Sequence, residues 1–253
     1  RNEQEALEIT FSAILAQNIQ WFPNVVRAIQ QLKLGRQFTK NEMEVIKQAE
    51  IIQAEILGNG EKVTKTKILA QNTNWKNAEK AIMELNRHDL LDIKNIAKIE
   101  NKKLAKIIIS SGYNNQKAKK LKNLCNFLLK NYKGNLSLLF ENEIKELRGQ
   151  LLSVNGIGPE TADSIILYAA KKPIFVIDAY TKRILNRLGF KEKTYEELQN
   201  LLMGRIPKNE RLFNEYHALF VELGKNICRK NPICDKCPIN MHCSYYKTIY
   251  MGR

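Results

Sequence analysis

Apolar side chains recur at three- and four-residue intervals along most of this 253-residue chain, which is the spacing of a buried helix face. Residues 78–85 and 165–169 show the pattern most clearly. Strand-type alternation is nearly absent, and the few glycines and prolines fall between apolar segments, as at residues 58–60, 156–159 and Pro173. The pattern predicts an all-α protein with short connections.

One apolar motif occurs twice. Ile-Leu-Ala-Gln-Asn followed by a tryptophan stands at residues 14–21 and again at residues 68–75. Two copies are too few for a repeat array, so they predict a local duplication or two helices of similar role. In the polar stretch between them, Thr39 or Asn41 is a candidate cap for a helix that runs towards Leu57.

Composition and charge narrow the range of partners. With 44% hydrophobic residues, the chain can bury one large core or two smaller ones, so we expect one or two compact lobes. The 41 Lys and Arg residues outnumber the 26 Asp and Glu residues, which gives a net charge of +15 and a field that attracts a polyanion. Nucleic acid is the leading candidate, although a lysine-rich genome or a warm habitat would give the same bias.

We see no membrane-spanning apolar run and no charged leader, and expect a soluble intracellular protein of the cytoplasm or nucleoid.

A helix-hairpin-helix signature lies at residues 151–170. An apolar helix end meets Gly156-Ile157-Gly158, and a second apolar helix then opens. Two glycines two residues apart let the backbone turn tightly and approach another backbone, while amide groups at the next helix start can hold a phosphate oxygen. The alternative is a plain turn between two helices.

A single carboxylate follows this motif. The apolar run of residues 173–177 leads to Asp178, and the basic pair Lys182-Arg183 comes next. A carboxylate beside apolar residues is poorly solvated, so a cationic transition state in front of it would feel a strong local field. Asp178 is also a candidate cap for the helix of Thr181 onward, and both roles can coexist.

Four cysteines near the end of the chain have the spacing of metal ligands. Cys228, Cys234, Cys237 and Cys243 follow the pattern C-x5-C-x2-C-x5-C, which is short enough to wrap one small inorganic core. Zinc and an iron–sulfur cluster both accept four thiolates, and two disulfides fit an intracellular protein poorly. Cys125 stands alone on an apolar helical face, where we expect a small buried hydrophobe.

Together these segments resemble the endonuclease III superfamily of helix-hairpin-helix DNA glycosylases. Residues 154–169 and 175–189 are similar to the family's hairpin and to its aspartate-bearing loop and helix. Residues 68–73 resemble the helix whose glutamine fills the gap left in the duplex, and residues 111–119 resemble the next family motif. The resemblance spans residues 66–247 and leans towards the endonuclease III-related, 3-methyladenine DNA glycosylase III branch.

The resemblance implies a two-lobed helical fold and a partner that is double-stranded DNA with a damaged base. By the same resemblance the four cysteines hold a [4Fe–4S] cluster, with zinc as the alternative, although their first gap is one residue shorter than is usual in the family. Arg229, Lys230 and Lys236 lie in this loop and either meet phosphates or are simply solvated. His217 falls where the family often has a histidine near the DNA-facing helix, and a buried core histidine fits equally well.

Glu160 departs from the family's bifunctional members, which carry a lysine directly before the Thr-Ala of the hairpin. That lysine attacks the sugar to form a Schiff base, and a carboxylate cannot do so. We therefore expect a monofunctional glycosylase that hydrolyses the N-glycosidic bond. Glu160 either contacts the extruded base or a water, or is a solvated first-turn glutamate favoured by the helix dipole.

The resemblance also implies a role for each site residue. Gln71 fills the gap after the nucleotide is extruded, and Asp178 stabilises the sugar cation or orients the attacking water. The expected DNA-binding residues are Gln71, Asn72, Gly156, Ile157, Gly158, Glu160, Thr161, Lys182 and Arg183.

The resemblance also implies that the chain has three parts. Residues 1–65 form an N-terminal helical region that belongs to the cluster-side lobe or extends it. Residues 66–190 form a lobe of six-helix type with the hairpin at about 147–169. Residues 191–253 form the C-terminal helices and the cluster loop at 228–243.

We expect a monomeric base-excision-repair glycosylase acting on alkylated purines such as 3-methyladenine. Alternatives within the enzyme class are a bifunctional glycosylase and lyase for oxidised pyrimidines, or an enzyme for uracil, hypoxanthine or mismatched bases. From another class, the chain could be a non-catalytic DNA-binding module, since such hairpins also serve as phosphate clamps. Asp178 favours the enzyme over the non-catalytic module, because a phosphate clamp needs no carboxylate at that spacing.

Overall fold

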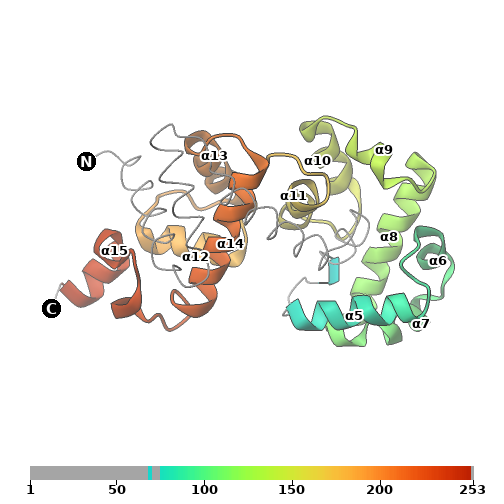
Figure 1. Cartoon of the computed structure of the whole chain (residues 1–253), viewed down its shortest axis with the longest axis horizontal. Coiled ribbons are helices and arrows are strands. Elements are labelled where there is room, and N and C mark those ends of the chain that lie inside the picture. The colour runs from blue at the N-terminus through green and yellow to red at the C-terminus, as the bar shows by residue number, and fades with distance from the viewer. Residues whose placement is uncertain (1–67, 70–74, 252–253) are drawn as a thin grey trace, which may run out of the picture. The chain divides into compact units, whose positions relative to one another are not determined.

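The computed structural model describes residues 68, 69 and 75–251, and every regular element in these residues is a helix. The all-α prediction is confirmed (Figure 1). The helix expected to run towards Leu57, the first copy of the repeated motif, and Gln71 and Asn72 lie outside the described residues. Within the described part of the chain, no helix has the length and apolar character of a membrane span.

The described residues fall into two compact units, which meet in sequence between Ile174 and Phe175. The three-part division at residues 65 and 190 stays a prediction. The unit that ends at Ile174 contains α5 (Trp75–Arg87), α6 (Ile93–Lys98), α7 (Asn101–Ile107), the 3-10 turn η1 (Ile109–Ser111), α8 (Asn114–Tyr132), α9 (Leu136–Phe140), α10 (Ile144–Ser153) and α11 (Pro159–Tyr168).

Helix α8 is the centre of this unit, and α6, α7 and α9 pack against it (Figure 1). Its 19 residues include no glycine or proline, and its apolar residues recur at helical spacing, so one face is buried. Cys125 lies on that face with 1% of its surface exposed, as predicted. The buried positions of α8 are Lys117, Ala118, Leu121, Leu124, Cys125 and Leu128.

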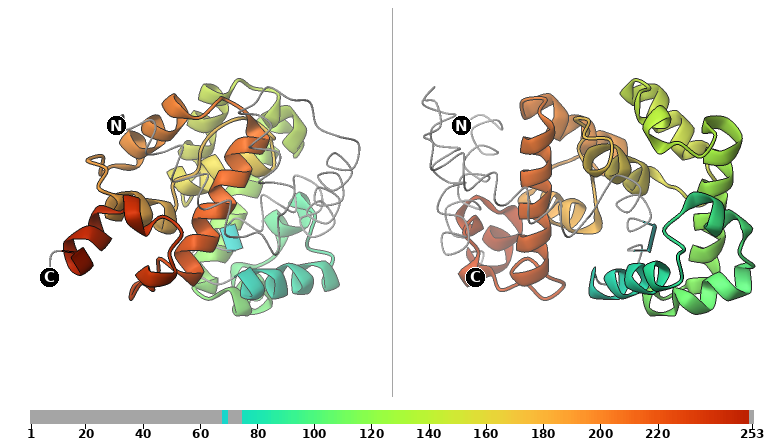
Figure 2. Two further views of the ribbon diagram at one scale, coloured as in Figure 1. Left: turned by 60° about the vertical axis from the view of Figure 1, so that its left-hand side comes forward. Right: turned by 45° about the vertical axis from the view of Figure 1, so that its right-hand side comes forward.

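The unit that starts at Phe175 is built on two helices that pack together, α12 (Ala179–Leu188) and α14 (Glu210–Asn226) (Figure 2). Its core contains Phe175 with two rings of α14, Phe213 at 5.4 Å and Phe220 at 6.3 Å between centroids, both edge-on. The remaining elements are α13 (Tyr195–Arg205), the 3-10 turns η2 (Cys234–Lys236) and η3 (Asn240–His242), α15 (Ser244–Tyr246) and the π-helical turn η4 (Lys247–Met251).

Candidate active site and nucleic-acid interface

The hairpin between α10 and α11 has the tight turn that its glycines predict. The Ile157 amide donates to the Val154 carbonyl at 3.0 Å, and Gly156 has a φ of +101°, in the left-handed region. A Cβ at Gly156 would also collide with the aliphatic part of Lys120 on α8. Both the dihedral and the close packing therefore require glycine at this position.

The second hairpin glycine, Gly158, is different. Its φ is −95°, it is exposed, and a Cβ built there would have no atom of the described residues within 4 Å. The fold itself does not need a glycine here, so the absence of a side chain leaves room for another molecule's backbone. Gly158 is also the N-cap of α11, whose N-terminus carries partial positive charge.

Predicted site residues gather in the first turn of α11. Glu160 is exposed, whereas Ile157 and Thr161 are buried, with 5% and 8% of their surfaces exposed. The side chains of Ile157 and Thr161 therefore support the turn, and their backbone is what the hairpin can present to a phosphate.

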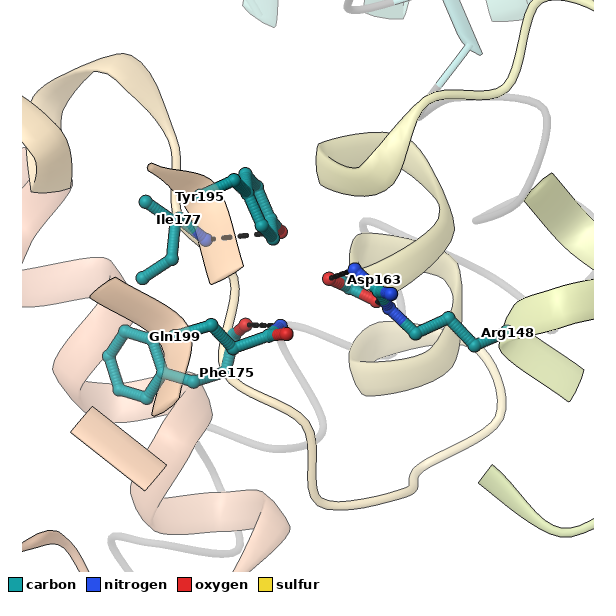
Figure 3. Close-up of polar contacts among 6 residues, drawn as sticks. All are labelled: Arg148, Asp163, Phe175, Ile177, Tyr195 and Gln199. Carbon is teal, nitrogen blue, oxygen red and sulfur yellow. Dashed lines mark hydrogen bonds and ion pairs between the residues drawn. The ribbon is translucent and has the colours of Figure 1, made fainter. Parts of the chain in front are cut away.

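A buried ion pair, which the sequence reasoning missed, joins the two hairpin helices. Arg148 of α10 donates to both carboxylate oxygens of Asp163 on α11, Nε to Oδ1 at 2.7 Å and Nη2 to Oδ2 at 3.1 Å (Figure 3). Asp163 is fully buried, and 22% of the Arg148 side chain is exposed. A separate hydrogen bond ties the hairpin turn to α8, where the Asn123 side-chain amide donates to the Asn155 carbonyl at 2.9 Å. An aspartate two residues before the apolar run 165–168 was the available signal.

In the other unit, Asp178 is the N-cap of α12, so the predicted cap is confirmed. Its Oδ1 accepts the Thr181 amide at 2.7 Å, and its Oδ2 lies 3.7 Å from Nε2 of His217 on α14. The side chains are 13% and 10% exposed, respectively. One carboxylate oxygen is thus fixed by the helix end and the other faces a buried histidine, while some solvent access remains.

The extended segment before Asp178 is held by α13. The Gln199 side-chain amide donates to the Phe175 carbonyl at 2.6 Å, and the Ile177 amide donates to the Tyr195 hydroxyl at 3.3 Å (Figure 3). Residues 174–177 are all buried. This apolar packing and the two hydrogen bonds fix the backbone that delivers the carboxylate.

The two predicted DNA-binding cations of α12 have different surroundings. Lys182 is exposed. Arg183 donates from Nε to the Cys228 carbonyl at 2.8 Å and from Nη2 to the Gly224 carbonyl at 2.7 Å, and its guanidinium lies over the Tyr180 ring. Arg183 therefore ties α12 to the end of α14, and its contact with DNA stays a prediction.

The four cysteines form one neighbourhood after α14. Burial, followed by the charges of the other cysteines, raises the pKa of Cys234, and burial raises that of Cys237 to about 11. Arg187 of α12 donates to the Cys228 Sγ at 3.3 Å and to the Arg229 carbonyl at 2.7 Å. In the part of the chain that the structure describes, no three His, Cys, Asp or Glu side chains are arranged as a metal-holding group. The metal ligands predicted from the sequence stay a prediction.

One exposed turn of the first unit lies in the motif at residues 111–119, in which the sequence assigned no role to individual residues. Gly112 has a φ of +65° and Tyr113 a φ of +45°, and Tyr113 is the N-cap of α8 with 66% of its surface exposed. Ile109, just before, is 67% exposed. Two large apolar side chains on a constrained turn mark a surface that can meet a flat partner such as a base. Gly112 followed by an aromatic residue was the available signal.

Comparison with known proteins places these features in a family. The family model described as HhH-GPD superfamily base excision DNA repair protein matches residues 66–208, more than half of the chain. A protein of Methanocaldococcus jannaschii assigned as a DNA repair glycosylase is 46% identical over 180 residues, which are 70% of this chain and 81% of that protein. Endonuclease III of Thermotoga maritima is 31% identical over 185 residues, 71% of this chain and 80% of that enzyme.

Solved structures agree with the sequence relatives. The 3-methyladenine DNA glycosylase of H. pylori, solved with 1,N6-ethenoadenine bound, aligns with a TM-score of 0.56 and 28% identity over 72% of this chain and 96% of that one. A non-covalent complex of endonuclease III with DNA aligns with a TM-score of 0.66 at 21% identity over 86% of this chain and 100% of that one, which shows a shared fold. The chain therefore belongs to the HhH-GPD superfamily of base-excision DNA repair proteins and is a DNA N-glycosylase.

Proposed function

We propose that this glycosylase is monofunctional and removes alkylated purines such as 3-methyladenine from duplex DNA. The observation that carries the proposal is Glu160, an exposed carboxylate in the first turn of α11, where bifunctional relatives carry a lysine. A carboxylate cannot form the imine that leads to strand cleavage. The 28% identical H. pylori enzyme is a 3-methyladenine DNA glycosylase, which supports the choice of base.

The hairpin would bind the DNA backbone without reading its sequence. Gly158 has no side chain, and no atom in the described part of the chain fills the space where one would stand, so a phosphate can approach the N-terminus of α11. The net charge of +15 supplies a general attraction to the duplex. Gln71 would occupy the gap left by the extruded nucleotide, with Tyr113 stacking on a neighbouring base.

Asp178 would stabilise the positive charge that develops on the sugar as the base leaves, or orient the water that captures it. Its Oδ1 is already bound by the Thr181 amide, so the carboxylate is held in one orientation without reorganisation during the reaction. His217, 3.7 Å from Oδ2, would fix the second oxygen. The water supplies hydroxyl to the sugar carbon and gives its remaining proton to the Asp178 carboxylate, and the base leaves with the electrons of the glycosidic bond.

The cysteine loop fits a [4Fe–4S] cluster by its donors. After burial, the charges of the neighbouring cysteines help to raise the pKa of Cys234 and Cys237, and a bound metal centre would relieve that repulsion between thiolates. Cys228, Cys234, Cys237 and Cys243 would hold the cluster, and zinc is the alternative. When bound, the cluster supplies a structural brace for the exposed basic loop.

Iron and sulfide analysis of anaerobically purified protein tests this assignment, and stoichiometric zinc without iron would overturn it.

Single-turnover base release on a panel of lesion duplexes tests the function. Each duplex is assayed with and without alkali, and borohydride is added in parallel to trap any imine. We expect release from 3-methyladenine duplexes, strand breaks only after alkali, and no trapped adduct. Breaks without alkali would refute the monofunctional assignment, and release confined to oxidised pyrimidines would refute the assigned base.

Variants of the carboxylate complete the test. Asp178→Asn should lower the release rate by about 10²–10⁴-fold while DNA affinity is kept. Glu196→Gln is the matched control, since Glu196 is an exposed carboxylate on α13, and its rate should be unchanged. Equal release rates for wild type and Asp178→Asn would refute the catalytic role of Asp178, whereas no release from any duplex would favour the non-catalytic DNA-binding module.

A further inference from the structure

A lysine is among the largest fully buried side chains of the protein. Lys117 of α8 has 2% of its surface exposed, and its Nζ donates to the Leu69 carbonyl at 2.9 Å and to the Ser111 carbonyl. Burying an ammonium is costly unless its N–H groups are satisfied. In agreement, burial and the nearby charge of Lys120 lower the pKa of Lys117 to about 8.

The two carbonyls belong to separate segments of the chain. Leu69 stands two residues before Gln71, the side chain proposed to enter the duplex. Ser111 is followed directly by the turn at Gly112 that exposes Tyr113. One ammonium thus links the backbone leading to Gln71 with the backbone of the turn.

An apolar residue would be the less costly choice at this position. Its helical neighbours Ala118, Leu121 and Leu124 are buried and apolar, so a leucine or methionine could continue that surface without desolvating a charge. What an apolar residue cannot do is donate hydrogen bonds to two backbone carbonyls at once. The charge therefore serves the two segments that it joins.

We propose that Lys117 is a positioning residue that holds the Leu69 backbone and the Ser111–Tyr113 turn in a fixed relation, so that Gln71, two residues later in the sequence, and Tyr113 engage a damaged site together. This inference rests on the proposed function of Gln71. It also extends that function, because two segments that the Lys117 ammonium couples would then recognise the gap in the duplex together. Lys117 itself touches neither DNA nor the reacting bond.

The first test measures selective binding. Affinity is measured for a duplex with a tetrahydrofuran abasic analogue and for the same duplex undamaged. Lys117→Met should weaken binding to the abasic duplex by roughly 10- to 100-fold, as expected for lost charged hydrogen bonds, and leave the undamaged duplex unaffected. Lys117→Arg, which keeps donors, should restore part of the selectivity. Cys125→Ala, a buried change on the same helix, is the control and should keep full selectivity.

The second test measures coupling by double-mutant cycles. Gln71→Ala and Tyr113→Ala are each measured in wild type and in Lys117→Met, on the abasic duplex. We expect each to weaken binding in wild type and to have little further effect without the lysine. If Gln71→Ala has no effect in wild type, the proposed function of Gln71 fails. If its effect is equally large in both backgrounds, the positioning role of Lys117 fails and the function of Gln71 stands.

Hydrogen exchange of the free protein keeps the inference testable if Lys117→Met does not fold. In the wild type, peptides covering residues 66–75 and 108–116 should open together, with a common rate and a common pH dependence. In a folded variant both should exchange faster while the hairpin at 153–160 is unchanged. Independent opening of the two peptides in the wild type would overturn the proposal.

Discussion

The ion pair between Arg148 and Asp163 gives a prediction whose sign and size follow from the structure. The carboxylate is fully buried, whereas 22% of the arginine side chain is exposed. Removing the arginine leaves a charge with no route to solvent, but removing the carboxylate leaves a guanidinium that can reach water. Arg148→Met should therefore cost about 3–5 kcal/mol of the free energy of unfolding. Asp163→Asn, which keeps hydrogen-bonding atoms, should cost about 1–2 kcal/mol.

The double variant sharpens this prediction. Arg148→Met combined with Asp163→Asn removes both charges and should be more stable than Arg148→Met alone, because no buried carboxylate then lacks its arginine. Urea unfolding is followed by circular dichroism and by hydrogen exchange of peptides from α10 and α11, so that unfolding of this unit is resolved from that of the other. Equal costs for the two single variants, or a double variant less stable than Arg148→Met, would refute the reasoning.

Three further predictions concern single positions. Gly156→Ala should lower the free energy of unfolding by about 1–3 kcal/mol because of its positive φ, whereas Gly158→Ala should leave urea stability unchanged and weaken binding to undamaged duplex; an unchanged affinity would remove Gly158 from the interface. Since the pKa of Lys117 is lowered to about 8 from 10.5, the unfolded chain binds more protons between those values, and stability should rise with pH across that window in wild type but not in Lys117→Met; parallel stability curves would contradict this. His217→Gln should lower single-turnover release by about 10-fold without weakening DNA binding, while in an Asp178→Asn background it should have little further effect; additive losses would show that His217 does not act through the carboxylate.

Local patterns in the sequence were enough to predict the elements that the site depends on. The helices on either side of Gly156 follow from apolar spacing and the glycine-rich break between them. Asp178 was predicted as a helix cap because an aspartate before a helical segment can satisfy its first amide groups, and the structure confirms that contact. These features depend on residues within a few positions of one another.

The missed contacts join residues that are far apart in sequence. Lys117 lies on the apolar face of α8 by spacing, yet its charge indicates a surface position, and only the two carbonyls brought to it by folding resolve the conflict. The resemblance implied that Arg183 binds DNA, which stays a prediction. Nothing in the sequence indicated that its guanidinium also binds carbonyls more than 40 residues later in the chain. Periodicity shows which positions are buried, but it does not identify tertiary partners.

Helix α12 carries Asp178 at its beginning and grips the cysteine loop through Arg187 near its end. With ten residues it is about 15 Å long, and a tilt of about 5° about one end moves the other by about 1.3 Å. Misplacement of a catalytic group by about 1 Å can cost about 100-fold in rate. Oxidative damage to the cysteine loop would therefore lower turnover before it weakened DNA binding. A damaged molecule would still bind lesions that it no longer repairs.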